Sequence, residues 1–176
     1  EITIVADKFS NENWIAADIL AQAEHDLNAQ CILISKSKEF LNKVKKSINI
    51  QLKDLSRKII AKKSLITNGI FIYVKTDKQI VNIVNLIAPE HLELNTKNYN
   101  NIASKIKNAG SICLGKYSAM AATDYSVGTN HILPTNSSAK FSSGLSVYDF
   151  FKRISYINLS KNGLETIGEQ VINLAK

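Results

Sequence analysis

The chain has 176 residues, of which 45% are hydrophobic and 21% are charged, a composition and length that suit one domain with a sizeable core. No apolar run approaches the roughly 20 residues that span a bilayer and no signal-peptide pattern opens the sequence, so we expect a cytoplasmic protein without membrane contact. The net charge of +7 comes from scattered lysines without a recognised motif or an aromatic stacking platform, which argues against nucleic-acid binding.

Apolar runs of strand length alternate with segments of helical periodicity through the first two thirds of the chain. Ser10 or Asn11 is suited to cap the first helix, and Pro89 is expected to stop the fourth helix and hold Ala88 extended. The alternation predicts an α/β fold, a mostly parallel sheet flanked by helices. The predicted strands are 2–6, 30–35, 70–75, 92–96 and 111–115, and the predicted helices are 11–26, 38–55, 56–67, 77–87 and 99–108.

From residue 116 to 145 the sequence is rich in Ser, Thr, Asn, Gly and Ala and has few periodic apolar residues, which predicts a long functional loop. Residues 147–153 and 161–175 then predict a C-terminal helical segment. We therefore divide the chain into an α/β domain at 1–135 and a connecting loop with a helical segment at 136–176. Cys31 and Cys113 each lie in a strand-like apolar run, so we expect two buried thiols and no disulfide framework.

The chain has three histidines, His25, His91 and His131, and each lies in a polar cluster. Imidazole ligates metals and titrates near neutrality, so these clusters predict one divided active site. Gln22 and His25 are three residues apart on a predicted helix and so share one face, where an amide oxygen and an imidazole nitrogen suit zinc. The alternative is that they are ordinary surface residues, as a Gln and a His at helical spacing more often are. Asp124 offers a third ligand if the fold brings it close.

Glu90 and His91 lie between a helix-stopping proline and a strand, at an edge of the sheet, where α/β proteins place their sites. Their ordinary pKa values allow them to divide general acid and base work. The alternative is that they only flank the strand. Farther along, Gly128 and Pro134 fix an irregular backbone around His131, which either holds polar groups against a ligand or forms a rigid turn.

Four stretches, at 15–26, 88–94, 124–135 and 141–153, together resemble histidinol dehydrogenase, in the order of that family: Ile-Ala-Ala-Asp-Ile-Leu-Ala-Gln-Ala-Glu-His-Asp, Ala-Pro-Glu-His-Leu-Glu-Leu, Asp-Tyr-Ser-Val-Gly-Thr-Asn-His-Ile-Leu-Pro-Thr and Phe-Ser-Ser-Gly-Leu-Ser-Val-Tyr-Asp-Phe-Phe-Lys-Arg. The resemblance runs over essentially the whole chain. It implies an incomplete Rossmann-like domain and the oxidation of L-histidinol through histidinal to L-histidine, the last steps of histidine biosynthesis, with two NAD molecules and one zinc ion in each site of a homodimer.

The resemblance also implies roles for single residues. Gln22, His25 and Asp124 would bind zinc and, with His91 and His131, the substrate. His91 would take the hydroxyl proton and Glu90 would activate the water that attacks the aldehyde.

By the same resemblance, a substrate-binding serine and most NAD contacts would precede Glu1, and a glutamate and a partner-donated zinc histidine would follow Lys176. We therefore expect a central to C-terminal piece of the enzyme without cofactor-binding residues, inactive alone. Thr123, where the family usually has glycine, and the incomplete ends motivate a second hypothesis, a non-catalytic Rossmann-like domain of that family that binds a ligand or a partner.

Overall fold

A computed structural model describes all 176 residues of the chain. The contacts within the chain divide it into two compact units, Glu1–Leu145 and Ser146–Lys176. Whether the chain has a domain boundary after residue 135 stays a prediction. All the candidate site residues lie in the first unit.

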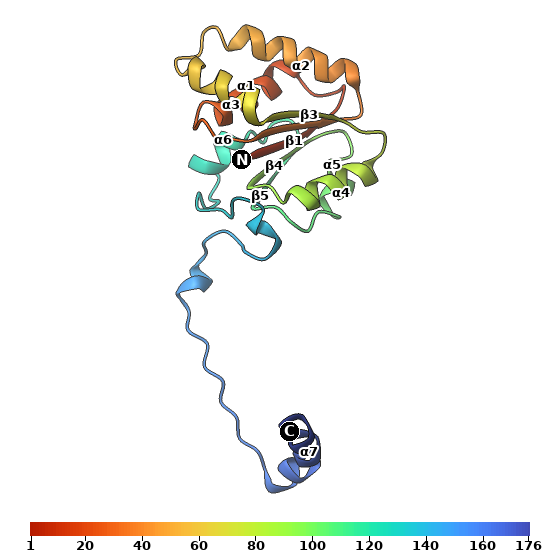
Figure 1. The fold of residues 1–176 in the computed structure, drawn as a ribbon, viewed down its shortest axis with the longest axis vertical. Helices are drawn as coiled ribbons and strands as arrows, with labels where there is room; N and C mark the ends of the chain where they lie inside the picture. Colours follow the sequence, from red (N-terminus) through yellow and green to blue (C-terminus); the bar gives the residue numbers. More distant parts are fainter. The chain divides into compact units, whose positions relative to one another are not determined.

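The first unit is built on a five-stranded sheet in which every pairing is parallel (Figure 1). The strand order is β3-β2-β1-β4-β5, the order of five neighbouring strands in a Rossmann fold. The predicted α/β fold with a mostly parallel sheet is therefore confirmed. The three central strands, β1, β2 and β4, are buried along their whole length because helices cover both faces. The strands are β1 Ile2–Ala6, β2 Cys31–Ser35, β3 Gly69–Tyr73, β4 His91–Asn95 and β5 Ser111–Leu114.

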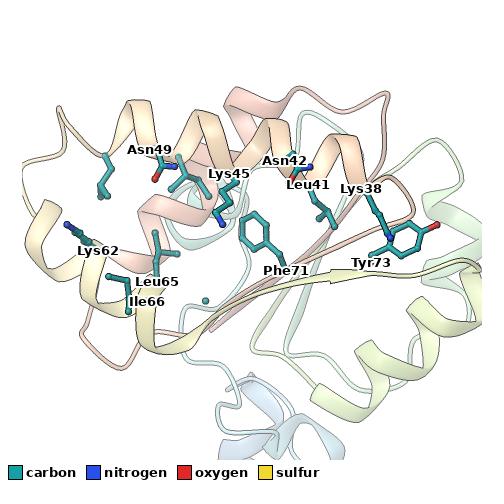
Figure 2. Close-up of a pocket in the computed structure, with 13 residues that line it drawn as sticks. Lys38, Leu41, Asn42, Lys45, Asn49, Lys62, Leu65, Ile66, Phe71 and Tyr73 are labelled. Atoms are coloured by element: carbon teal, nitrogen blue, oxygen red, sulfur yellow. The ribbon is translucent and has the colours of Figure 1, made fainter.

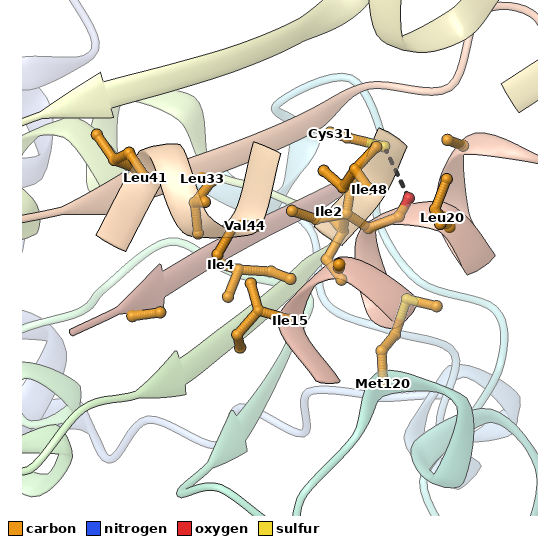
Figure 3. Packing of buried hydrophobic residues seen from close by; sticks show 14 of the residues in the cluster. Ile2, Ile4, Ile15, Leu20, Cys31, Leu33, Leu41, Val44, Ile48 and Met120 are labelled. Atoms are coloured by element: carbon orange, nitrogen blue, oxygen red, sulfur yellow. Dashed lines mark hydrogen bonds between the residues drawn. The ribbon is translucent and has the colours of Figure 1, made fainter. Parts of the chain in front are cut away.

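Helices α1 to α3 cover one face of this sheet, and α4 and α5 cover the other (Figure 1). On the first face, Ile4 and Leu33 of the sheet pack with Ile15 of α1 and Val44 of α2 (Figure 3). The helices of this unit are α1 Glu12–Ala23, α2 Lys38–Gln51, α3 Lys58–Asn68, α4 Asp77–Ile87, α5 Tyr99–Ala103 and α6 Met120–Tyr125.

Both cysteines are buried and free, as predicted. The Cys31 thiol donates a hydrogen bond to the carbonyl oxygen of Ile19, and burial raises the pKa of Cys31 to about 12 (Figure 3). A thiol with so high a pKa is protonated at neutral pH and therefore serves packing rather than nucleophilic chemistry.

Several helices differ from the sequence predictions; α2, for example, ends at Gln51 and not at residue 55. Helix α1 ends at Ala23, because the Asp26 carboxylate accepts a hydrogen bond from the amide of Asn28 and closes a turn. Helix α5 ends at Ala103, because the Asn85 side chain takes the backbone groups that a longer helix would have used, donating to the Lys105 carbonyl and accepting from the Lys107 amide. Helix α6 lies inside the segment that we predicted to be a loop.

Ala88 follows α4 and adopts a left-handed conformation, with φ 51° and ψ 61°. The expected extended geometry was therefore wrong. The amide of Ala88 donates to the carbonyl of Val84 at 2.8 Å, which closes the end of the helix and offsets the strain of a non-glycine residue in this region.

The second unit contains a short 3-10 helix at Val147–Phe150 and helix α7 at Lys161–Leu174. Ser160 caps α7 by accepting a hydrogen bond from the amide of Gly163, and no residue of this helix is buried. The predicted C-terminal helix is confirmed, whereas the helical turn before it is shorter than predicted. Across the whole chain, none of the helices combines the length and the apolarity that crossing a bilayer requires.

Candidate functional site

One cavity of about 560 Å³ in the first unit is lined by all six candidate site residues of the sequence analysis. These residues come from the end of α1, the start of β4, helix α6 and the loop that follows α6. They are Gln22, His25, Glu90, His91, Asp124 and His131. The fold thus brings together groups that lie up to about a hundred residues apart in the sequence.

The cavity lies at the end of the sheet where the strands begin, which we call its amino end. Glu1 precedes β1, and Glu90 and His91 stand at the start of β4. We expected a site at an edge of the sheet, but open α/β sheets usually bind ligands at the opposite end, beyond the carboxyl ends of the strands. The site therefore departs from the common Rossmann arrangement.

A larger groove, of about 750 Å³, lies between α2, α3 and β3 and contains none of the candidate residues (Figure 2). Its walls are aliphatic and aromatic side chains such as Leu41, Leu65 and Phe71, with the lysines Lys38, Lys45 and Lys62 around them. It has no histidine, carboxylate or thiol, so the acid–base chemistry of the chain belongs to the smaller cavity.

His91 is the most enclosed group of the candidate site, with only 5% of its surface exposed. Its Nε2 atom lies 3.8 Å from Oε1 of Glu90 and 4.0 Å from Oδ1 of Asp124, distances longer than a hydrogen bond. Burial lowers the pKa of His91, and the two carboxylates oppose this effect. The imidazole is therefore neutral at pH 7 and able to accept a proton, with two carboxylates placed to stabilise the resulting cation.

Glu90 is mostly enclosed and lies beside His91 with one oxygen facing it. Its other oxygen, Oε2, accepts a hydrogen bond of 2.7 Å from the main-chain nitrogen of Glu1. Glu90 thus places a carboxyl group at the cavity wall, the type of group that can take a proton from a water molecule.

Asp124 lies on helix α6, and its Oδ1 atom is 3.5 Å from Nδ1 of His131. The neighbouring Thr123 turns its hydroxyl to the carbonyl oxygen of Met120, to which it donates a hydrogen bond of 2.6 Å. The Thr123 side chain is thus accommodated within its own helix, and the Asp124 carboxylate still reaches the cavity. Helix α6 is held against the core by Met120, which packs with the α1 side of the sheet.

Gln22 and His25 reach the same cavity from the C-terminal end of α1. Gln22 is buried in the last turn, whereas His25 follows the end of the helix and is exposed. The carbonyl oxygen of His25 accepts a hydrogen bond of 3.3 Å from the Arg57 guanidinium. The two side chains therefore do not share one continuous helical face, as the sequence suggested, but they line one wall.

An imidazole, an amide and a carboxylate on one cavity wall form a donor set that suits zinc. No group of three His, Cys, Asp or Glu side chains lies close enough to hold a metal ion. The combination of Gln22, His25 and Asp124 contains only two side chains of those four types, so it is not among the groups that this statement covers. In donor chemistry, the residues present fit a zinc ion.

The sequence left open whether the loop after α6 forms a rigid turn or holds polar groups against a ligand, and the structure has features of both. Asn130 satisfies the main chain, since its Oδ1 accepts from the amide of Ile132 and its Nδ2 donates to the carbonyl of Leu145. Gly128 adopts a φ of 85°, which favours glycine. His131, in contrast, is exposed and directed to Asp124. A rigid turn held by Asn130 and a polar side chain that faces the cavity, His131, are therefore adjacent in this loop.

The sequence reasoning missed two carboxyl groups behind the cavity, Asp18 and Glu93, and the Arg57 guanidinium on its rim. The signal for Glu93 was present in the sequence. His91, Glu93 and Asn95 alternate with Leu92 and Leu94 at the predicted strand 92–96, and the strands of a parallel sheet are covered on both faces, so three polar side chains had to share one covered face.

A parallel α/β sheet with a buried neutral histidine between two carboxylates defines an acid–base site of the kind found in enzymes. The family described as histidinol dehydrogenase matches residues 1–176, and the chain belongs to this family.

Similar proteins cover nearly all of the chain. A histidinol dehydrogenase of Pelagibacter ubique is 67% identical over 175 residues, which are 99% of this chain and 41% of that protein. One from Listeria monocytogenes serotype 4b is 46% identical over the whole chain, again 41% of its own length. The crystal structure of histidinol dehydrogenase from Elizabethkingia anophelis superposes with a TM-score of 0.89 at 37% identity, covering 99% of this chain and 40% of that one. The chain thus spans about two fifths of the length of these relatives.

Proposed function

We propose that the chain is the part of a histidinol dehydrogenase that binds zinc and substrate in the oxidation of L-histidinol, through histidinal, to L-histidine with NAD. The observation that carries this proposal is that the six candidate residues, drawn from four segments of the sequence, line one cavity. The names of the relatives and the match over all 176 residues support it.

His91 is the proposed base of the first oxidation. Its neutral imidazole accepts the proton of the substrate hydroxyl while a hydride leaves the same carbon for the nicotinamide ring. The imidazolium that forms is stabilised by the carboxylates of Glu90 and Asp124, which lie 3.8 and 4.0 Å from Nε2. These carboxylates favour the protonated form of His91, and burial favours the neutral form, so the proton can be both taken and released.

Glu90 is the proposed base of the second oxidation. Its carboxylate takes a proton from the water molecule that attacks the aldehyde carbon, and a second hydride then leaves for a second NAD. Glu90 and His91 are adjacent in sequence and at one wall of the cavity, so a single bound substrate can meet both groups. His131 is proposed to contact the substrate from the opposite loop.

Gln22, His25 and Asp124 are the proposed zinc ligands. Zinc bound there would supply a fixed attachment for the imidazole and the amine of the substrate. The side chains of Gln22 and Asp124 are largely enclosed, so their positions are set by packing before a ligand arrives. NAD is the proposed hydride acceptor, and the resemblance assigns its contacts to segments that these 176 residues do not include.

We extend the proposal to the whole enzyme as a cytoplasmic homodimer of histidine biosynthesis with histidinol as its substrate. The chain alone is proposed to be inactive, since by resemblance the partner subunit donates a ligand and the NAD contacts lie elsewhere.

Calorimetric titration of the chain with zinc, with and without histidinol, tests this function. We expect one site, tightened by histidinol and lost in His25→Ala and in Asp124→Ala. Asp77→Ala is the matched control, because it removes an aspartate at the far end of the sheet. If zinc binds equally to all four proteins, or to none, the metal assignment is wrong, and the non-catalytic ligand-binding domain becomes the better account of the chain.

A further inference from the structure

A row of polar side chains runs along the face of β4 that is turned to α1. His91, Glu93 and Asn95 are exposed by only 5%, 2% and 4%, respectively. The leucines between them, Leu92 and Leu94, pack on the opposite face with the cluster beneath α4 and α5. Such a row is costly to bury unless each polar group finds a partner, so its partners should be identifiable.

Only one of the two oxygens of the Glu93 carboxyl group accepts a hydrogen bond. Oε1 accepts a hydrogen bond of 3.0 Å from Nδ2 of Asn95. Oε2 is buried and has no donor, while the carboxyl group that lies within hydrogen-bonding reach of Glu93 is that of Asp18 on α1. Two ionised carboxylates are both acceptors and repel each other, so only a proton between them can make this contact favourable.

We infer that Asp18 and Glu93 share one proton at neutral pH and that this bridged pair is a positioning device, which fixes α1 against β4 so that Gln22 and His25 stay opposite His91. The inference deepens the proposed function, because Gln22 and His25 are the ligands assigned there. Neither Asp18 nor Glu93 touches the substrate in this account, and both act through the helix.

The surroundings of Glu93 favour the protonated acid. Burial raises the pKa of Glu93 to about 8, and the negative charge of Asp18 adds to the effect. Burial also raises the pKa of Asp18. The other titratable groups on this side are His91 on the same strand, Cys113 on the paired strand β5 and Asp124 on α6. Burial raises the pKa of Cys113 to about 11, so its thiol stays neutral and adds no charge to the pair.

The position of the pair along α1 explains what it controls. The start of the helix is tied to β4 by the Ser10 hydroxyl, which donates to the carbonyl oxygen of Asn95. Asp18 makes the second link, to Glu93, in the middle of the helix. Gln22 follows Asp18 by about one helical turn, so a rotation of α1 that broke the second link would also turn Gln22 away from the cavity.

The shared proton is tested on the metal-free chain by carbon-13 NMR of the glutamate carboxyl groups. We expect a signal that titrates near pH 8 and is absent from Glu93→Gln. Between the ordinary pKa of 4.5 and about 8, the folded chain keeps the Glu93 proton that the unfolded chain releases, so the contribution of Glu93 to stability falls as pH rises through this window. This fall should disappear in Glu93→Gln. A Glu93 signal that titrates near 4.5 would overturn the inference.

The positioning role is tested by comparing Glu93→Gln, whose amide can still donate to Asp18, with Glu93→Leu, which cannot. At pH 7 we expect zinc affinity within about twofold of wild type for Glu93→Gln and a loss of about tenfold for Glu93→Leu, the size seen when support for a ligand is removed. The amide signals of Gln22 and His25 should shift only in the leucine variant. Glu12→Gln, which removes another carboxylate from α1, is the control and should change neither.

Unchanged amide signals and zinc affinity in Glu93→Leu would overturn the positioning role. If the wild-type chain binds no zinc, the proposed function fails, but the amide signals and the glutamate titration still decide the present inference. If Glu93→Leu does not fold, Asp18→Ala replaces it. That variant removes both the negative charge and the bridge, so the Glu93 titration should move toward its ordinary value and the Gln22 signal should shift; no change in either would again refute the pair.

Discussion

The two ends of the sheet use their polar residues differently. At the carboxyl end, where the strands finish, Ser37 and Thr76 cap α2 and α4, and the Asp7 carboxylate accepts from the amides of Phe9 and Lys97. At the amino end, Glu90, His91 and Asp124 approach one another around a cavity without hydrogen bonds among them. Polar groups that complete the backbone hold a fold together, whereas groups without such partners are available to a ligand.

The helices give the two ends opposite polarity. Helices α1 and α4 finish at the amino end, where the negative ends of their dipoles favour cations. At the carboxyl end, helices begin with the positive ends of their dipoles, and Lys8, Lys36 and Lys97 line a cavity of about 490 Å³ together with Asp7 and Asp77. The proposed zinc ion is a cation, so it matches the end of the sheet at which the candidate residues lie.

The largest expected difference between the two ends comes from the glycines that flank β5. A Cβ atom on Gly110, at the amino end, would lie 2.6 Å from the carbonyl oxygen of Glu90. We expect Gly110→Ala to cost about 1–3 kcal/mol in the free energy of unfolding and to weaken histidinol binding in the presence of zinc, because the backbone beside His91 must move. Urea unfolding and calorimetry measure both effects.

Gly115→Ala is the matched change at the carboxyl end. Gly115 has a φ of 81°, and an added Cβ would meet only the Tyr99 ring at 3.5 Å. The expected cost is about 1–2 kcal/mol from backbone strain, with ligand binding unchanged. Equal losses of histidinol affinity in both glycine variants would show that the two ends are not functionally distinct.

Asp7→Ala should affect stability alone. The variant loses two hydrogen bonds to backbone amides, of 2.9 and 3.0 Å, and we expect a loss of about 1–2 kcal/mol because the site is partly exposed. Zinc affinity should stay at the wild-type value. Denaturant unfolding with a parallel zinc titration gives the answer, and a loss of zinc binding at constant stability would contradict it.

His91 should make the stability of the metal-free chain depend on pH. Because burial lowers its pKa below the ordinary value of 6.5, the unfolded chain takes up a proton first as pH falls, and stability is lost below pH 6.5. His91→Gln should flatten this part of the profile. The measurement is the urea midpoint between about pH 7.5 and 5.5, the range in which free imidazole titrates. A profile that is the same in variant and wild type would refute a neutral buried His91.

Lys36→Gln should have the smallest effect. Lys36 and Asp77 form an ion pair of 2.6 Å at the carboxyl end, but 40% and 28% of their side-chain surfaces are exposed. Solvent screening limits such pairs to less than about 1 kcal/mol, and added salt should reduce the difference between variant and wild type further. A larger loss, measured by thermal unfolding at two salt concentrations, would mean that the carboxyl end depends on its charges more than on its backbone caps.

The sheet was predictable because its strands are short apolar runs separated by helices, and the end of α4 was predictable because Pro89 follows it. Two elements were not. Helix α6 is too short to show periodicity and forms because Met120 packs into the core. Helix α5 stops where the Asn85 side chain, from another helix, takes over its backbone groups. Both depend on tertiary contacts.

The candidate residues were found from local chemistry and from the resemblance, since each histidine lies within a recognisable stretch. The pairing of Asp18 with Glu93 was not predictable in this way. It depends on how a helix is rotated over a strand that lies about seventy residues later, and neither residue is unusual in its local sequence.

The pairing of β1 with β4 also determines when the site can assemble. In this pairing Ile2 lies opposite His91, and two βα units lie between the two strands in the sequence. Forming the pair therefore closes a long loop, which costs conformational entropy. Helix α1, β1 and β2 can assemble from contacts between residues that are close in the sequence. The cavity wall that carries Glu90 and His91 forms only when β4 pairs with β1, which is a late, non-local step, and Asp124 follows β4 in the sequence. Folding kinetics followed at His25 and at His91 would therefore differ in order, with the cavity among the last features of the unit to appear.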